Sequence, residues 1–367
     1  MNDSNSSPQN SARKPWIKPT LTVHRTGLVN KFGAARREAW SDELFGLRVE
    51  RLTEEYGSPL FVFSEERLRD NVRRLKRAFG SHYPRVQYAW SYKTNYLAAI
   101  CNVFHQEGAW AEVVSGFEYD KARAEGVPGE QVIFNGPHKT RPALERAVRE
   151  NAHVHVDHLD ELYLLEDVAR SLGKRMKVCI RLNFETGYTE NWSRFGFNVE
   201  SGQAMDAAWR IAASENLSLA GLHSHIGTFV LDQRAYTAQV RIMAAFMKEV
   251  EERTGCEIEV IDIGGGFASR NALQGIYLPP EQVVPSIEQY AEAICTPLLE
   301  ATHERAANGR RLPLLVLETG RAIVDDAGAL VTTVFGNKRL PDGRRAAILD
   351  AGVNLLFTAF WYNHYIQ

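Results

Sequence analysis

The stretch Tyr88-Ala-Trp-Ser-Tyr-Lys93-Thr-Asn95 decides how the rest of this sequence is organised. The apolar, β-prone run from Val86 to Trp90 predicts a short buried strand. Lys93 follows at once, and a helical pattern from Leu97 to Glu107 comes next. A lysine at the end of a core strand can point into a cleft, where desolvation makes the amine lose its proton more easily and form an imine.

The composition indicates a globular protein of one large or two ordinary domains, because 44% of the 367 residues are hydrophobic and 24% are charged. The formal net charge of -2 gives no reason to expect nucleic acid or an acidic membrane surface as a partner. No apolar run is long enough to span a bilayer, and the N-terminus has no hydrophobic signal core. Four widely spaced cysteines without metal-ligand spacing indicate buried thiols in a reducing cytoplasm: Cys101, Cys179, Cys256 and Cys295.

Eight candidate strands follow one another along the chain, and helical patterns separate most of them. This alternation predicts an α/β protein with a TIM-type (β/α)8 barrel, and a doubly wound open sheet remains the alternative. The predicted strands are Val86–Trp90, Ala111–Val114, Val132–Phe134, His153–Val156, Met176–Leu182, Leu217–Leu222, Glu257–Ile263 and Leu314–Glu318.

Residues that could carry chemistry recur where these strands end, and in a barrel the carboxyl ends of the strands form the active-site rim. A lone lysine, a triple glycine or a buried histidine at one strand end would be ordinary. Their joint placement at one rim therefore predicts a functional site made of Lys93, Glu112, Arg181, Asn183, His223 to Thr228, Gly264 to Gly266, and Glu318 to Arg321.

The domain organisation follows from the same pattern. A strand over Pro59–Phe63 precedes a helix that Ser64 caps, and Leu68, Val72, Leu75 and Phe79 share one face of it. After Arg321 the pattern is β-type, with runs at Gly328–Val334 and Arg345–Leu349 around a Pro341-Asp-Gly turn. We expect four segments: a disordered tail over 1–15, an N-terminal segment over 16–63 contributing strands to a β domain, the barrel over 64–321, and an incomplete, mostly β domain over 322–367.

The triple glycine suggests an anion site, because Gly264, Gly265 and Gly266 let backbone amides approach a phosphate closely. The surrounding sequence lacks both the Gly-Lys-Ser/Thr of a nucleotide P-loop and the spacing of a dinucleotide fingerprint. Arg321 could add a charged partner to such a phosphate. Lys93 would hold an aldehyde as a Schiff base, and these residues together predict a pyridoxal 5'-phosphate site.

Five motifs carry a resemblance to a known family. They read Trp90-Ser-Tyr-Lys93-Thr-Asn95, Val114-Ser-Gly-Phe-Glu118, His225-Ile-Gly-Thr228, Gly264-Gly-Gly266 and Glu318-Thr-Gly-Arg321. In these motifs the chain resembles the fold-type III pyridoxal-phosphate decarboxylases, the alanine-racemase-like barrel group. Within that group it is most similar to the enzymes that act on diaminopimelate, ornithine, lysine and arginine.

The resemblance implies a pyridoxal-phosphate-dependent decarboxylase of a basic or diamino amino acid, working as a homodimer with its active site at the interface. It assigns the Schiff base to Lys93, ring stacking to His225 and the pyridine-nitrogen carboxylate to Glu318, which would make the ring a strong electron sink. It also implies that the strand Leu60–Phe63 lies outside the barrel. Further cofactor contacts are expected from Thr228, Gly264, Gly265, Gly266, Arg321, Glu112 and Arg181.

Three departures from the family pattern matter. Glu112 stands where the family usually has Asp, so the local hydrogen bonding is expected to differ. Thr358 stands where diaminopimelate decarboxylases carry an arginine that grips the distal carboxylate, which puts diaminopimelate itself in doubt. The family's C-terminal cysteine motif and active-site tyrosine would lie beyond Gln367.

Three other functions compete with a decarboxylase. A racemase has the same fold and cofactor, but an arginine faces its pyridine nitrogen where Glu318 stands here. A metal-dependent barrel hydrolase could use His153 with His155 and His223 with His225, although we expect no metal because Lys93 and the glycines would then be unexplained. A catalytically idle pyridoxal-phosphate-binding protein is the third.

Overall fold

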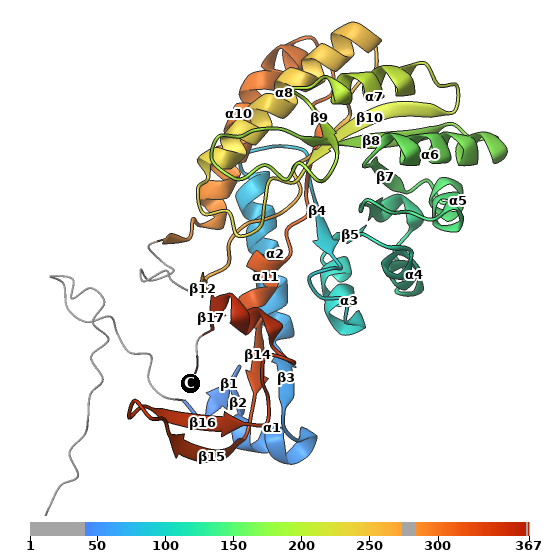
Figure 1. The fold of residues 1–367 in the computed structure, drawn as a ribbon. Coiled ribbons are helices and arrows are strands. Elements are labelled where there is room, and N and C mark those ends of the chain that lie inside the picture. Colours follow the sequence, from blue (N-terminus) through green and yellow to red (C-terminus); the bar gives the residue numbers. More distant parts are fainter. Residues whose placement is uncertain (1–40, 274–282, 365, 367) are drawn as a thin grey trace, which may run out of the picture. The chain divides into compact units, whose positions relative to one another are not determined.

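The eight predicted strands form one closed parallel barrel in the computed structural model, which describes residues 41–273, 283–364 and 366. The sheet runs in the order β4, β5, β6, β7, β8, β10, β11, β13, and β13 pairs with β4 to close the ring (Figure 1). The open-sheet alternative is therefore wrong. The strands are β4 (Val86–Ser91), β5 (Trp110–Val113), β6 (Val132–Phe134), β7 (His153–Val156), β8 (Met176–Asn183), β10 (Leu217–Ser224), β11 (Val260–Asp262) and β13 (Leu314–Leu317).

Helices follow most barrel strands, as the sequence pattern predicts. Figure 1 shows α4, α5 and α6 outside the strands that they connect. The long helices α8 and α10 pack against each other, and α10 also packs against the helix that precedes the barrel, α2. The helices around the barrel are α2 (Glu65–Gly80), α3 (Ala98–Gln106), α4 (Gly116–Ala124), α5 (Arg141–Arg149), α6 (Leu159–Ser171), α7 (Gln203–Ala212), α8 (Arg234–Thr254) and α10 (Ile287–Ala307).

Helix α2 forms as the sequence predicts. The Ser64 side chain accepts a hydrogen bond from the Arg67 backbone N–H and so caps the helix. Its apolar face is fully buried against the barrel: Leu68, Val72, Leu75 and Phe79 are all at most 2% exposed.

An aromatic stack of Phe79, Phe267 and Tyr290 packs next to the triple glycine. The ring of Phe267, which follows Gly266, lies 4.6 Å from that of Tyr290 on α10 and 5.9 Å from that of Phe79 on α2. The Tyr236 hydroxyl on α8 donates to the Gly265 carbonyl at 3.0 Å. The packing of three helices thus fixes the loop after β11.

The strand before the barrel pairs with a strand after it. β3 (Leu60–Phe63) is not in the barrel sheet and runs antiparallel to β14 (Gly328–Val331), with Phe63 opposite Gly328. A separate antiparallel pair joins β15 (Val334–Arg339) to β16 (Arg345–Leu349). Five two-residue strands complete the described strands. Two antiparallel pairs join β1 (Glu43–Leu44) to β2 (Leu47–Arg48) and β12 (Ala272–Leu273) to β17 (Tyr362–Asn363), and β9 (Phe197–Asn198) extends the barrel sheet beside β8. Helix α1 (Val49–Tyr56) follows β2.

Three predicted elements differ in the structure. The run Gly328–Val334 is not one strand, because Asp350 Oδ1 accepts from the Thr333 backbone N–H and breaks it into β14 and β15. The β-type pattern does not begin directly after Arg321, where helix α11 (Arg321–Val324) forms one short turn. The strand predicted over Glu257–Ile263 is limited to β11, since Arg305 takes the Ile258 carbonyl.

Some expectations fall outside the described residues. The disordered tail over 1–15 and the β-prone piece Thr20–Val23 belong to this group. Within the described residues, none of the helices is both long and apolar enough to cross a bilayer.

We predict that Phe79→Ala lowers the free energy of unfolding by about 3–5 kcal/mol, because it removes a fully buried ring from the contact between α2 and the glycine loop. Urea denaturation followed by far-UV circular dichroism measures this change. Arg77→Ala, an exposed position on the same helix, is the matched control and should change the value by less than about 0.5 kcal/mol. Equal effects of the two substitutions would contradict the packing assignment.

Candidate active site

A series of hydrogen bonds joins Lys93 to Glu318 across the carboxyl ends of the barrel strands. Lys93 Nζ donates to Glu112 Oε2 at 2.7 Å, and the Ser91 hydroxyl donates to the same oxygen. Asn135 Nδ2 donates to Glu112 Oε1 at 3.0 Å and to Glu318 Oε1 at 2.6 Å. Glu112, Asn135 and Glu318 are buried, so one polar network connects the ends of β4, β5, β6 and β13.

The barrel register creates this network. Ser91 on β4 lies opposite Glu112 on β5, and parallel pairing brings their side chains to the same height. Asn135 follows β6 by one residue, and its backbone N–H still bonds to the Val113 carbonyl of β5. Glu318 follows β13, where its N–H donates to the Gly264 carbonyl at 2.8 Å.

The protonation of Lys93 differs from the expectation of a desolvated, readily deprotonated amine. Burial by the surrounding protein lowers the pKa of Lys93, but the Glu112 and Glu318 carboxylates raise it by more, and the net pKa is above its usual value. The side chain also keeps 47% of its surface accessible to solvent. Burial does desolvate Lys93 as the sequence suggested, but the two carboxylates outweigh it, and in the cofactor-free chain Lys93 is held as an ammonium paired with Glu112.

Two buried imidazoles lie beside Glu318 inside the barrel. His223 Nε2 is 3.5 Å from Glu318 Oε2, and the rings of His155 and His223 have their centroids 4.8 Å apart. Burial lowers the pKa of both histidines well below the usual value, so they face Glu318 as neutral rings.

Asp262 continues this cluster on β11. Its Oδ2 is 3.9 Å from His155 Nε2, and its Oδ1 accepts from the Gly264 N–H at 2.8 Å. Burial, with the charge of Glu318 adding to it, raises the pKa of the Asp262 carboxyl well above its usual value. His155, His223 and Asp262 are therefore favoured in their uncharged forms beside the network that links Glu318 to Lys93.

His225 stands apart from these two histidines and contacts the glycine loop. Its Nδ1 accepts a hydrogen bond from the Gly265 N–H at 3.1 Å, and its ring centroid lies 5.1 Å from that of Trp192. Burial first, and the positive charges of Lys93 and Arg181 next, lower the pKa of His225 to about 3. His225 therefore presents a neutral ring to the rim.

The three glycines are required by close contacts. Gly264 and Gly266 have positive φ values of 66° and 97°, which a side chain would strain. A Cβ on Gly265 would lie 2.6 Å from the Glu318 carbonyl oxygen, and one on Gly266 would lie 2.3 Å from that of Gly227. The loop therefore packs directly against the residues that follow β10 and β13.

Groups suited to an anion remain without partners beside this loop. Among the described residues, the Gly266 N–H and the Thr228 hydroxyl make no hydrogen bond, and the Arg321 guanidinium forms no ion pair. Arg321 instead lies over the Tyr362 ring, with 4.6 Å from its Cζ to the ring centroid. These residues follow β10, β11 and β13, which are neighbours in the sheet.

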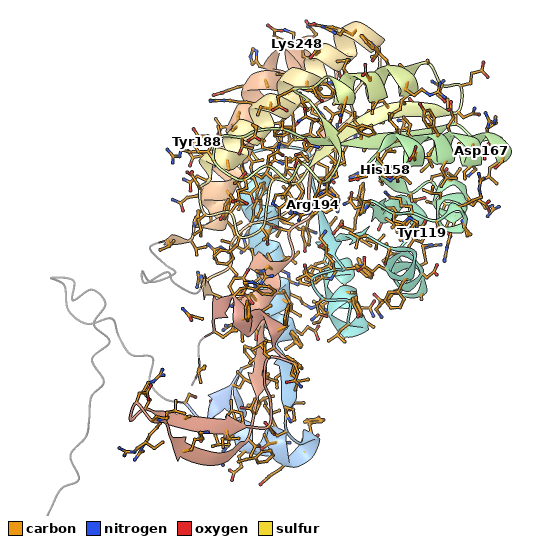
Figure 2. All side chains as sticks on the ribbon, in the orientation of Figure 1. Tyr119, His158, Asp167, Tyr188, Arg194 and Lys248 are labelled. Atoms are coloured by element: carbon orange, nitrogen blue, oxygen red, sulfur yellow. The ribbon has the colours of Figure 1, made fainter. Side chains whose placement is uncertain are left out.

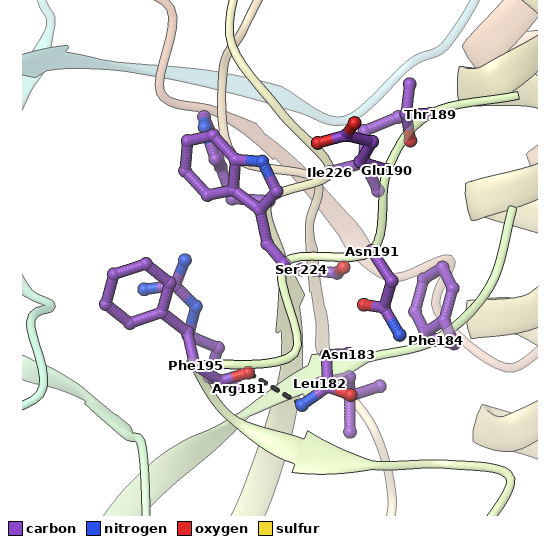
Figure 3. A pocket seen from close by; sticks show the side chains of 12 residues that line it. Arg181, Leu182, Asn183, Phe184, Thr189, Glu190, Asn191, Phe195, Ser224 and Ile226 are labelled. Atoms are coloured by element: carbon purple, nitrogen blue, oxygen red, sulfur yellow. Dashed lines mark hydrogen bonds between the residues drawn. The ribbon is translucent and has the colours of Figure 1, made fainter.

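Arg181 on β8, the strand next to β10, lines a small hollow together with His225 and the loop that follows β8. Its Cζ is 4.4 Å from the Phe195 ring centroid, and its Nη1 is 3.9 Å from Asp157 Oδ1. Figure 3 shows Arg181 behind the Phe195 ring and the bond from Asn183 Nδ2 to the Phe195 carbonyl, which measures 2.7 Å. The same loop carries Arg194, labelled in Figure 2, whose guanidinium also stacks on Phe195.

The sequence prediction and the structure agree on the rim but not on every partner. The structure brings Lys93, Glu112 and Glu318 into one hydrogen-bonded network. Three other predicted groups lie outside that network but on the same rim: His225 with the glycine loop, Arg321, and Arg181. Sequence reasoning missed Asn135, Asp262 and Trp192, and it considered His155 only as a possible metal ligand. Asn135 could have been found, because it directly follows the predicted strand Val132–Phe134.

The four histidines considered as metal ligands do not converge on one point. His155 and His223, with Glu318, have one donor atom each within 4.8 Å of one another. His153 instead bonds the Glu130 carbonyl and stacks on Trp110, and His225 bonds the glycine loop. The four-histidine arrangement that would support a barrel hydrolase is therefore absent from these described residues.

Comparison with known proteins gives a consistent result. Residues 68–325 match the family model of the pyridoxal-dependent decarboxylases, pyridoxal binding domain. The chain is 31% identical to diaminopimelate decarboxylase of Methanocaldococcus jannaschii over 86% of its own length and 72% of that protein, and 30% identical to the Bacillus subtilis enzyme over 91% and 74%.

Solved structures agree. A crystal structure of the M. jannaschii enzyme superposes with a TM-score of 0.75 at 30% identity, covering 84% of this chain and 71% of that one. A lysine/ornithine decarboxylase from Vibrio vulnificus, crystallised with putrescine, shares the fold with a TM-score of 0.67 at 24% identity, over 85% of this chain and 77% of that one. The match to decarboxylases disfavours the racemase and the idle protein, and the chain belongs to the pyridoxal-dependent decarboxylases, amino-acid carboxy-lyases that use pyridoxal 5'-phosphate.

Proposed function

We propose that this chain decarboxylates a basic or diamino amino acid at the rim defined by Lys93, His225 and Glu318. The observation that carries the proposal is the hydrogen-bonded series from Lys93 through Glu112 and Asn135 to Glu318. This series holds the Lys93 amine and the buried Glu318 carboxylate at two separate points of one rim. A flat cofactor needs such an arrangement, because the amine must reach its aldehyde and the carboxylate its ring nitrogen.

The residues present fit pyridoxal 5'-phosphate. A phosphate dianion needs several donors, and the unpartnered Gly266 N–H, the Thr228 hydroxyl and the Arg321 guanidinium supply them. The glycines leave no Cβ between their backbone amides and a ligand. We propose that the Gly266 N–H, Thr228 and Arg321 bind the phosphate, that Gly264 and Gly265, whose N–H groups bond Asp262 and His225, shape the loop around it, and that Glu112 and Arg181 line the rest of the site.

The bound cofactor supplies an aldehyde that captures amines and a ring that accepts the electrons left by loss of CO₂. Lys93 would hold the aldehyde, and Glu112, which is bonded to the Lys93 ammonium, would take the proton that the amine must lose. Glu318 would hold a proton at the ring nitrogen, because a carboxylate beside that atom stabilises its charged form. The neutral ring of His225 would pack against the cofactor without competing for that proton.

The substrate proposal rests on the relatives and on Thr358. The relatives named above act on diaminopimelate, or on lysine and ornithine, and one M. jannaschii structure contains L-lysine. Thr358 Oγ1 is 3.0 Å from His364 Nε2, so a hydroxyl and an imidazole stand where the resemblance expects an arginine for a distal carboxylate. We therefore propose a substrate whose distal group is an amine rather than a carboxylate.

We further propose that the enzyme is a cytoplasmic homodimer. All four cysteines are free thiols, as a reducing compartment favours. Large aromatic side chains are exposed near the C-terminal part, including Phe335 at 73% and Phe360 at 65%, and such apolar surface supports a protein partner.

Lys93→Ala should abolish the cofactor's visible absorbance band and the mass that borohydride adds to the protein. The pH dependence gives a finer test, since only the neutral amine attacks the aldehyde. Glu112 raises the pKa of Lys93, so Glu112→Gln should lower that pKa and move the pH-dependent rise in attachment rate to lower pH. Stopped-flow mixing of cofactor-free protein with pyridoxal phosphate measures it. A borohydride-stable adduct on Lys93→Ala would reject the assignment.

Glu318→Gln should bind the cofactor nearly normally but lose most of the rate, because its charge matters most when electrons enter the ring. Single-turnover CO₂ release should fall by about 100-fold or more, a loss typical of removing such electrostatic stabilisation. Glu252→Gln, which changes an exposed carboxylate on the outer helix α8, is the matched control. Ready exchange of the α-proton in heavy water with no CO₂ release by the wild type would favour a racemase instead.

Ornithine or lysine should be a better substrate than meso-diaminopimelate, measured as kcat/KM for CO₂ release. Thr358→Arg should raise the kcat/KM for diaminopimelate relative to lysine by about tenfold or more, since a charged hydrogen bond to a carboxylate is worth about 1.5–3 kcal/mol. Ala212→Arg, which adds the same charge on the exposed side of α7, should leave the ratio unchanged. Diaminopimelate as the preferred wild-type substrate would overturn the proposal.

A further inference from the structure

One buried amide connects the two carboxylates that act at opposite ends of the proposed cofactor site. Asn135 is 3% exposed and belongs to none of the five motifs described above. Its Nδ2 reaches Glu112 Oε1 at 3.0 Å and Glu318 Oε1 at 2.6 Å. An amide nitrogen carries two hydrogens, so each carboxylate receives one of them.

The orientation of this amide is fixed by charge. Its Oδ1 has no hydrogen-bond partner among the residues that the structure describes. Rotating the amide by 180° would place that oxygen against two carboxylates and leave both without a donor, which is far less favourable. Asn135 therefore acts only as a donor toward the two acids.

Without the Asn135 amide, Glu112 and Glu318 would differ in the hydrogen-bond donors that remain to them. Glu112 is also bound by Lys93 and by Ser91, so it has other donors. Glu318 accepts from the Asn135 amide, and the neutral His223 ring at 3.5 Å and the Asp262 carboxyl, which favours its protonated form, lie beside it. Loss of the amide would remove the bond at Glu318 Oε1 and the link to Glu112, and the carboxylate would be free to turn away from its present direction.

We propose that Asn135 is a positioning residue that fixes the direction of the Glu318 carboxylate and its spacing from Glu112, so that Lys93 and Glu318 meet the aldehyde and the ring nitrogen of one cofactor together. This rests on the proposed function. In this role Asn135 works through the two carboxylates that it bonds.

Two substitutions separate this role from a structural one. Asn135→Leu keeps the approximate size but removes both donors. Asn135→Asp places a third carboxylate between two others, which repels them when ionised but donates one hydrogen bond when protonated. Asn71→Leu is the matched control, because the Asn71 amide likewise donates twice, to the Ile323 carbonyl and to Asp326, and neither acceptor belongs to the network between Lys93 and Glu318.

The readouts are the dissociation constant of pyridoxal phosphate from cofactor-free protein across pH 6 to 8, and kcat and KM of the holoenzyme. Asn135→Leu should weaken cofactor binding and lower kcat by about 10- to 100-fold, with KM little changed, as expected for a lost hydrogen bond to a charged group. The Asn135→Leu defect should not vary with pH. The Asn135→Asp defect should shrink as the pH falls, because protonation restores one donor.

Three results would overturn the inference: Asn135→Leu within twofold of wild type in both readouts, identical pH dependence for Asn135→Leu and Asn135→Asp, or an equal loss in Asn71→Leu. Thermal unfolding of each variant identifies a general loss of folding, and Asn135→Asp still reports through its pH dependence. If Lys93→Ala retained full activity the proposed function would fail, whereas an inert Lys93→Ala with normal Asn135 variants would reject this inference alone.

Discussion

Closure of the parallel barrel is the constraint on which the site depends. Pairing of β13 with β4 brings Leu315 opposite Val86 and completes a ring in which every strand points the same way. Because all eight carboxyl ends then open on one rim, residues from distant parts of the chain face each other. Glu318 and Lys93 come from the last and first strands of the ring and become neighbours only through this closure.

The polar interior of the rim is stabilised by pairing and by neutrality rather than by solvent. A buried carboxylate is costly unless it is hydrogen-bonded or matched by a positive charge. Glu112 is matched by Lys93, Glu318 is bonded by an amide, and Asp262 is favoured in its protonated form. Neutral imidazoles fill the space between the acids, so the rim holds several ionisable groups with little uncompensated charge.

The sequence was a good guide to the barrel and a weaker guide to the details of the rim. Strand periodicity located all eight barrel strands, and the strand-end rule located Lys93, Glu112, the glycines and Glu318. It missed Asn135, because an asparagine after a strand is usually read as a turn residue. It suggested that burial would lower the pKa of Lys93, but the register that places Glu112 beside the amine and raises that pKa appears only in three dimensions. The division of Gly328–Val334 depends on Asp350, a side chain from another strand's end, which local propensity cannot reveal.

The antiparallel pair of β3 and β14 has a consequence for biosynthesis. β3 leaves the ribosome before any barrel strand, but its partner is made only after the last one, so the earliest-made strand of this pair must wait for the whole barrel. Contacts between residues so distant along the chain form slowly, because a long loop must close first. During that time β3 has an unpaired edge, with Phe61 exposed even in the folded protein. Translation of this chain therefore passes through a state in which a hydrophobic edge strand needs protection, and a chaperone that holds the nascent N-terminal part would favour correct folding.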